Sequence, residues 1–182
     1  MHRSMLARAL MVAAITAVPT VYANAQELKG TFSGFNELGA LGSETGAILS
    51  NGQGTLTLKL DKQLQSIAFT LSYNDLGSPV TQAHIHFGKV HVAGGIIVFL
   101  CSNLANPPPG TQPCPANGGT VTGTLTPASV IGPIPQNLTP GNFDGFIRAL
   151  ESETAYGNIH TTQFPAGEIR AEIRRGLGPD QP

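Results

Sequence analysis

The chain has 182 residues, enough for one domain or two small ones. It carries 10 Lys and Arg against 11 Asp and Glu, and its charged fraction of 12% is half of the roughly 25% typical of soluble proteins. This composition excludes a charge-driven disordered chain and argues against a basic domain that binds nucleic acid. The 22 Gly and 14 Pro predict many turns, and the absence of Trp argues against an aromatic-rich cleft.

Residues 1–25 have the pattern of a secretory signal peptide. Basic residues come first, an apolar run follows from 9 to 18, and Ala23-Asn24-Ala25 is a small-x-small cleavage site. A membrane anchor is the alternative, but the run is shorter than the ~20 residues that span a bilayer. We therefore expect a secreted or periplasmic protein, with no membrane association after cleavage and a single domain over residues 26–182.

Apolar and polar residues alternate over much of the rest, as in half-buried strands. The pattern predicts strands, in chain order, at 54–60, 64–73, 80–87, 95–101, 119–126, 155–161 and 168–174, of which 95–101 is more continuously apolar than alternating. Residues 127–142 are rich in Pro, Gly and Asn and are expected to be a long connection. A helix is predicted over 142–151, because Phe143, Phe146, Ile147 and Leu150 share one helical face and Asn142 can cap it. The pattern predicts an all-β fold: an antiparallel, Greek-key-like β-sandwich or a small barrel with one short helix.

Cys101 and Cys114 are the two cysteines of the chain. In an exported protein, two thiols close in sequence most often form a disulfide. A pair of metal ligands is the alternative, which the long spacing and the intervening Pro107-Pro108-Pro109-Gly110 segment disfavour. We predict a disulfide between Cys101 and Cys114.

Two segments with histidine carry the chemistry that the sequence indicates. His84 and His86 are two residues apart on a predicted strand, so both point to the same face while Ile85 turns toward the core. His160 is expected to face outward on another strand, where Ile159 is inward. If the two strands are neighbours, three imidazoles converge on one side of the sheet. Three neutral imidazoles suit copper, with zinc as the alternative, and leave a fourth position open.

Glu168 begins the strand that follows the His160 segment after a tight turn. We expect it to orient a histidine from outside the ligand set, or to bind the metal directly. A surface ion pair between Glu168 and Arg170 is the simpler alternative. Histidines in a His-x-His strand also occur without metal, bonded to backbone carbonyls. His91 is expected to be exposed and not a ligand.

Other catalytic signals are weak. The chain has no Gly-x-Ser-x-Gly elbow and no phosphate-binding loop, and its carboxylates are scattered. We therefore predict no catalytic residue and no organic cofactor, which makes a non-enzymatic protein the favoured interpretation.

Four segments together resemble a known family. Thr81-Gln82-Ala83-His84-Ile85-His86-Phe87-Gly88, the apolar strand 94–100, Tyr156-Gly157-Asn158-Ile159-His160-Thr161 and Pro165-Ala166-Gly167-Glu168-Ile169-Arg170 are similar in order and spacing to the CHRD domain, named for chordin. The resemblance covers residues 28–174. It implies a secreted all-β module of the kind found in many exported bacterial proteins, for which the family supplies no settled activity. Two features depart from the family pattern. A Cys-bearing, Pro-rich insertion follows Leu100, and Ala171 stands where the family often has Gly.

The His84-Ile85-His86 strand also resembles the copper-binding strand of copper/zinc superoxide dismutase, although the bridging histidine and the zinc loop of that enzyme have no counterpart here. Three functions remain open at this point. The first is an exported module that binds a protein or small ligand and carries a copper or zinc site. The second is a copper-dependent redox enzyme resembling superoxide dismutase. The third is a structural extracellular or matrix protein without metal.

Overall fold

The computed structural model describes residues 26–38 and 46–176, so the predicted signal peptide lies outside the described residues. One α-helix and nine strands make up about half of this part of the chain. Their bounds are β1 Gln26–Ser33, β2 Gln53–Asp61, β3 Ser66–Asn74, β4 Val80–Phe87, β5 Gly95–Ser102, β6 Gly119–Leu125, α1 Phe143–Glu151, β7 Ala155–Thr161, β8 Ile169–Glu172 and β9 Arg174–Arg175. None of the described helices is long and apolar enough to cross a membrane.

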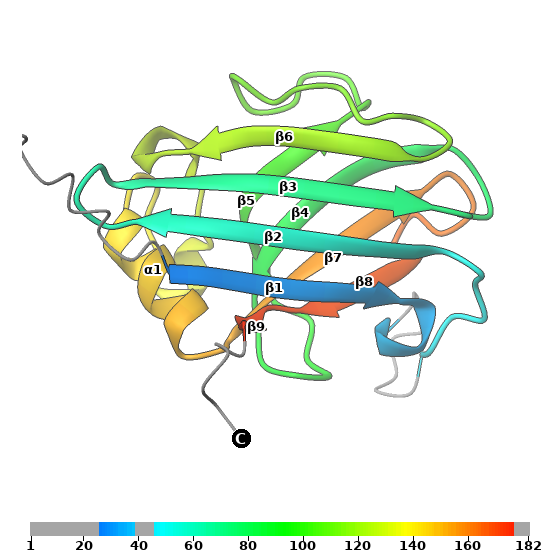
Figure 1. Cartoon of the computed structure of the whole chain (residues 1–182), viewed down its shortest axis with the longest axis horizontal. Helices are drawn as coiled ribbons and strands as arrows, with labels where there is room; N and C mark the ends of the chain where they lie inside the picture. Colours follow the sequence, from blue (N-terminus) through cyan, green and yellow to red (C-terminus); the bar gives the residue numbers. More distant parts are fainter. Residues whose placement is uncertain (1–25, 39–45, 177–182) are drawn as a thin grey trace, which may run out of the picture.

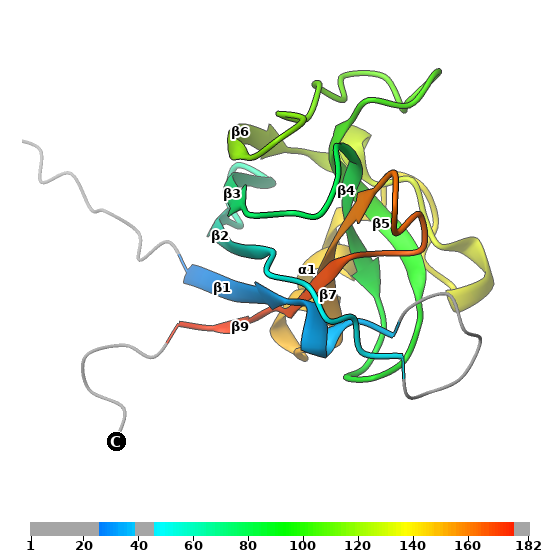
Figure 2. The same ribbon diagram turned by 90° about the vertical axis from the view of Figure 1, so that its right-hand side faces the viewer.

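The strands form one antiparallel sheet that curls into a nearly closed barrel. Its order is β5-β4-β7-β8-β1-β2-β3-β6, with β9 paired to β1. Figure 1 shows β1, β2, β3 and β6 in front and the β4, β5 and β7 strands behind them, and Figure 2 shows the same two layers from the side. The prediction of an all-β antiparallel fold with one short helix is confirmed.

The core fills the space between the two layers. Alternation in β2 buries Leu56, Leu58 and Leu60 and leaves Thr55 and Lys59 exposed, as the period of two requires. The helix α1 adds its apolar face, formed by Phe143, Phe146, Ile147 and Leu150. Asn142 caps this helix by accepting a hydrogen bond of 2.9 Å from the Gly145 N–H.

The sequence interpretation differs from the structure at both ends of the domain. It missed β1, where Leu28 and Phe32 are buried but the inward position between them is Gly30, so the apolar alternation is weak. Ala171 lies against Gly30: a Cβ atom added to Gly30 would lie 3.0 Å from the Cβ atom of Ala171. The strand predicted over 168–174 is interrupted at Ile173 and becomes β8 and β9.

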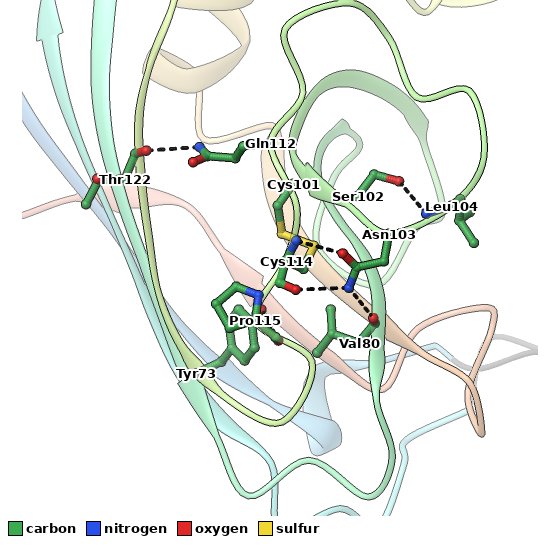
Figure 3. Close-up of a disulfide and its surroundings, with 10 residues drawn as sticks. All are labelled: Tyr73, Val80, Cys101, Ser102, Asn103, Leu104, Gln112, Cys114, Pro115 and Thr122. Atoms are coloured by element: carbon green, nitrogen blue, oxygen red, sulfur yellow. Dashed lines mark hydrogen bonds between the residues drawn. A yellow bond between two sulfur atoms is a disulfide. The ribbon is translucent and has the colours of Figure 1, made fainter.

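The disulfide prediction is also confirmed. Cys101 at the end of β5 and Cys114 form a buried disulfide. Asn103 fixes the same loop through its side chain, which accepts from the Cys114 N–H at 3.0 Å and donates to the Cys114 carbonyl at 3.0 Å and to the Val80 carbonyl at 2.9 Å (Figure 3). The proline-rich insertion is therefore attached to both β5 and the start of β4.

Candidate metal centre

The two histidine-bearing strands are neighbours in the sheet. β4 pairs antiparallel with β7, and the register places Gln82 opposite His160 and His84 opposite Asn158. Ala83, Ile85 and Ile159 belong to the hydrophobic core, so the alternating positions point to the opposite face. The convergence of His84, His86 and His160 that the spacing predicts is therefore present in the structure.

The three imidazoles form a compact buried cluster. One ring nitrogen from each residue can be chosen so that all three lie within 4.8 Å of one another. The ring centroids are 5.4 Å apart for His84 and His86, 4.9 Å for His84 and His160, and 6.4 Å for His86 and His160. The side chains are only 1%, 9% and 7% exposed in chain order, although they lie on the face opposite the core.

Backbone carbonyls fix the tautomers of two of these rings. The Nδ1 atom of His86 lies 2.9 Å from the Gly94 carbonyl oxygen, and the Nδ1 atom of His160 lies 2.9 Å from the Pro165 carbonyl oxygen. Because a carbonyl only accepts, each Nδ1 carries the hydrogen and donates it. The Nε2 atom of each ring is then left with a free lone pair.

These lone pairs have no hydrogen-bond partner among the described residues. The Nε2 atoms of His86 and His160 and both ring nitrogens of His84 are buried and unpartnered. A buried polar atom without a partner costs about 1–3 kcal/mol, so most such atoms in folded proteins are satisfied. Three converging lone pairs on neutral imidazoles are the donor set that copper and zinc accept, and the residues present therefore fit such an ion.

The surroundings keep the cluster neutral. Burial lowers the pKa of His84 to about 2, with the neighbouring imidazoles acting in the same direction, and burial lowers the pKa of His86 to about 4. The pKa of His160 is also lowered by burial. Since a metal ion binds the neutral imidazole, the binding of an ion at neutral pH would not require these rings to be deprotonated first.

Aromatic rings pack against two of the histidines. Phe99 of β5 meets His84 edge-on, with ring centroids 4.3 Å apart, and Tyr156 of β7 stacks on His86 with centroids 4.8 Å apart and planes at 4°. Tyr156 was missed by the sequence interpretation. Its signal was available, because Tyr156, Asn158 and His160 follow the period of two on one strand face.

The role predicted for Glu168 is not what the structure shows. Its carboxylate accepts hydrogen bonds from the Ser50 hydroxyl at 2.6 Å, the Gly77 N–H at 2.8 Å and the Thr161 hydroxyl at 2.7 Å. In the described part of the chain, none of its hydrogen bonds reaches a histidine, and main-chain carbonyls orient His86 and His160 instead. Glu168 lies just before β8 and faces the loops around Ser50 and Gly77, where it joins three segments as a structural acceptor.

The alternative of a surface ion pair between Glu168 and Arg170 is wrong as well. Arg170 is 1% exposed and pairs with Glu172, with Nε 3.0 Å from the carboxylate oxygen. Its guanidinium carbon lies 3.4 Å from the centroid of the Tyr156 ring. His91, in contrast, is exposed as expected and is not part of the cluster.

Comparison with known proteins gives one finding. The family model of the CHRD domain matches residues 40–173, which is more than half of the chain and includes all three histidines. Searches of curated proteins and of solved structures found no match.

Proposed function

Because this chain belongs to the CHRD family, we propose that it is an exported CHRD-domain binding module that holds one metal ion, copper or alternatively zinc, through His84, His86 and His160. The observation that carries the proposal is the set of buried, unpartnered ring nitrogens of these residues, directed together from two adjacent strands. A bound ion would replace the missing hydrogen bonds and remove the cost of burying these atoms.

The residues of the chain have separate tasks in such a site. The Nε2 atoms of His86 and His160 would be ligands, because their Nδ1 atoms already donate to the Gly94 and Pro165 carbonyls. Either nitrogen of His84 is free to be the third ligand. Phe99 packs against the His84 ring and Tyr156 against the His86 ring. Copper or zinc, when bound, supplies a Lewis-acidic centre whose remaining coordination position accepts a small ligand.

Two features of the chain support the proposed export. The N-terminal pattern predicts a cleaved signal peptide, and the disulfide between Cys101 and Cys114 is a bond that persists in oxidising compartments. We therefore place the mature protein in the periplasm or outside the cell, where it would meet its metal ion after translocation.

Elemental analysis of protein purified from the exported fraction tests the proposal. The wild-type protein should contain close to one equivalent of copper or zinc, and the double variant His84→Ala/His86→Ala should contain none. His91→Ala is the matched control, because His91 is an exposed histidine outside the cluster, and it should retain the metal. A wild-type protein that takes up neither ion after reconstitution, or a double variant that binds as well as wild type, would reject the proposal.

A further inference from the structure

A buried stack of three side chains adjoins the metal centre. The Tyr156 ring lies between the His86 imidazole, 4.8 Å away centroid to centroid, and the Arg170 guanidinium, whose carbon is 3.4 Å from the ring centroid. Arg170 comes from β8 and Tyr156 from β7, and the register of the two strands sets Tyr156 opposite Glu172. A cation over a tyrosine ring is attractive, most of all where water is excluded.

Arg170 also binds the backbone of the segment that connects β4 to β5. This segment, residues 88–94, is called the β4–β5 loop below. Arg170 donates from Nη1 to the Val92 carbonyl at 3.2 Å and from Nη2 to the Lys89 carbonyl at 3.1 Å, while its Nε donates to Glu172. The planar fork of a guanidinium can bind two carbonyls and one carboxylate at once, which a lysine ammonium cannot match in geometry.

In the described part of the chain, the hydrogen bonds that reach the middle of the loop, residues 89–93, from outside it come from Arg170. The side chains of residues 89–93 are all exposed, and the two valines of the loop, Val90 and Val92, retain 40% and 51% of their accessible surface. Its two ends are bonded to the sheet, since the Gly88 N–H donates to the Thr154 carbonyl and the Gly94 N–H donates to the Tyr156 hydroxyl at 3.0 Å. Gly88 passes so close to Tyr156 that an added Cβ would lie 2.9 Å from its ring.

The same loop orients one of the proposed ligands. The Gly94 carbonyl accepts from Nδ1 of His86 at 2.9 Å, and this bond keeps the His86 lone pair on Nε2. Displacement of the loop would therefore release the ring of His86 and the hydroxyl of Tyr156 together. Groups that orient a metal-bound histidine in this way commonly change metal affinity by about 10- to 100-fold when they are mutated.

We propose that Arg170 is a positioning residue for the metal centre: by holding the β4–β5 loop and Tyr156 against His86, it sets how slowly a bound ion is lost. This inference rests on the proposed function, because it requires that the histidines bind an ion. It assigns to Arg170 a task at the site without making it a ligand.

The test compares metal loss from Arg170→Lys, Arg170→Gln and wild type, all loaded with one equivalent of Cu(II) and then mixed with excess chelator. We expect both variants to release copper about 10- to 100-fold faster and to show an altered Cu(II) electron paramagnetic resonance spectrum, which a change in stability alone would not produce. Arg174→Gln is the matched control, because Arg174 forms an exposed ion pair with Glu153, and it should behave as wild type.

A second variant keeps the test decisive if the Arg170 variants fail to fold. Tyr156→Phe removes only the hydroxyl that bonds Gly94 and retains the ring between Arg170 and His86, and it should release copper measurably faster than wild type. Wild-type release rates and spectra in the folded Arg170 variants, or in Tyr156→Phe when the others do not fold, would overturn the inference while leaving the proposed function intact. A wild-type protein that binds no metal would instead overturn both.

Discussion

Individual residues show where this domain departs from an ordinary β-protein. Core positions of β4 and β7 carry apolar side chains, but the opposite face of these strands carries three histidines that are also buried. An imidazole in such a place is stable only in its neutral form, since burial disfavours the charged form. The cluster therefore links the stability of the metal-free protein to pH.

We expect the free energy of unfolding of the metal-free protein to fall as the pH decreases below about 6.5. His84 and His86 have pKa values lowered to about 2 and about 4 in the folded state, so in this range the unfolded chain binds protons that the folded chain does not. Between its folded and unfolded pKa values, each such histidine contributes a slope of about 1.4 kcal/mol per pH unit. The stability is complete above the unfolded pKa and is lost as the pH falls below it. Urea denaturation at a series of pH values measures it.

The variant His84→Leu isolates this effect from the titration of carboxylates, which both proteins share. Its unfolding free energy should depend less steeply on pH between about 6 and 4 than that of wild type, whereas the exposed-site variant His91→Ala should keep the wild-type slope. Equal slopes for wild type and His84→Leu would show that His84 is not neutral in the folded protein.

For individual residues, the sequence predicted part of the candidate site. The period of two placed His84 and His86 on one face and turned His160 outward on another strand, so their convergence depended only on the two strands being neighbours. Arg170 and Glu168 could not be assigned in the same way, because strand periodicity gives the face of a side chain but not the loop that covers it. Arg170 binds carbonyls of the β4–β5 loop and Glu168 binds residues near Ser50 and Gly77, and these contacts join segments about 80 to 120 positions apart.

Among the elements, the disulfide loop has the simplest energetic role. The bond between Cys101 and Cys114 closes a loop with a sequence separation of 13, and loop-closure entropy predicts about 3 kcal/mol of stabilisation for a loop of this size. The double variant Cys101→Ala/Cys114→Ala should lose about this amount in urea denaturation. Reduction of the wild-type disulfide should give a similar loss, and a loss well below 1 kcal/mol by both routes would contradict the expectation.

The elements with strong alternation were predicted within a few residues, and β1, where the alternation is weak, was missed. β2 and β3 bury alternate leucines, isoleucine and phenylalanine, whose pattern needs no tertiary context. β1 lacks this signal because Gly30 occupies an inward position against Ala171. The pairing of β4 with β7 was stated only as a condition, since about seventy residues separate the two strands and the order of a sheet depends on the packing of all its members.

For the whole molecule, the proposed metal ion would act as a ligand of the folded state alone. Two of its ligands lie on β4 and the third on β7, so the unfolded chain cannot present the three lone pairs together. At a free metal concentration of 100 times Kd the folded protein should gain about 2.7 kcal/mol. For a domain of this size the melting temperature should rise by about 5–10 °C.

Thermal unfolding of metal-free protein with and without added copper or zinc measures this shift. His160→Ala removes the ligand on β7 and should abolish most of the shift, while His91→Ala should leave it unchanged. A shift of the same size in His160→Ala would mean that the ion binds elsewhere on the protein.

The near-closure of the sheet bears on self-association, because in the strand order of the described residues it leaves only two edge strands at which another copy of the protein could pair. β5 and β6 are the edge strands of the sheet, and loops form hydrogen bonds with part of their backbone. The Ile97 carbonyl accepts from the Ile131 N–H, and the Ser102 N–H donates to the Gln112 carbonyl. The Thr122 carbonyl accepts from the Gln112 side chain. Open strand margins are the usual templates for strand-to-strand polymerisation. Loops that occupy parts of these margins reduce the backbone that this threonine-rich, weakly charged β-protein leaves open to such pairing.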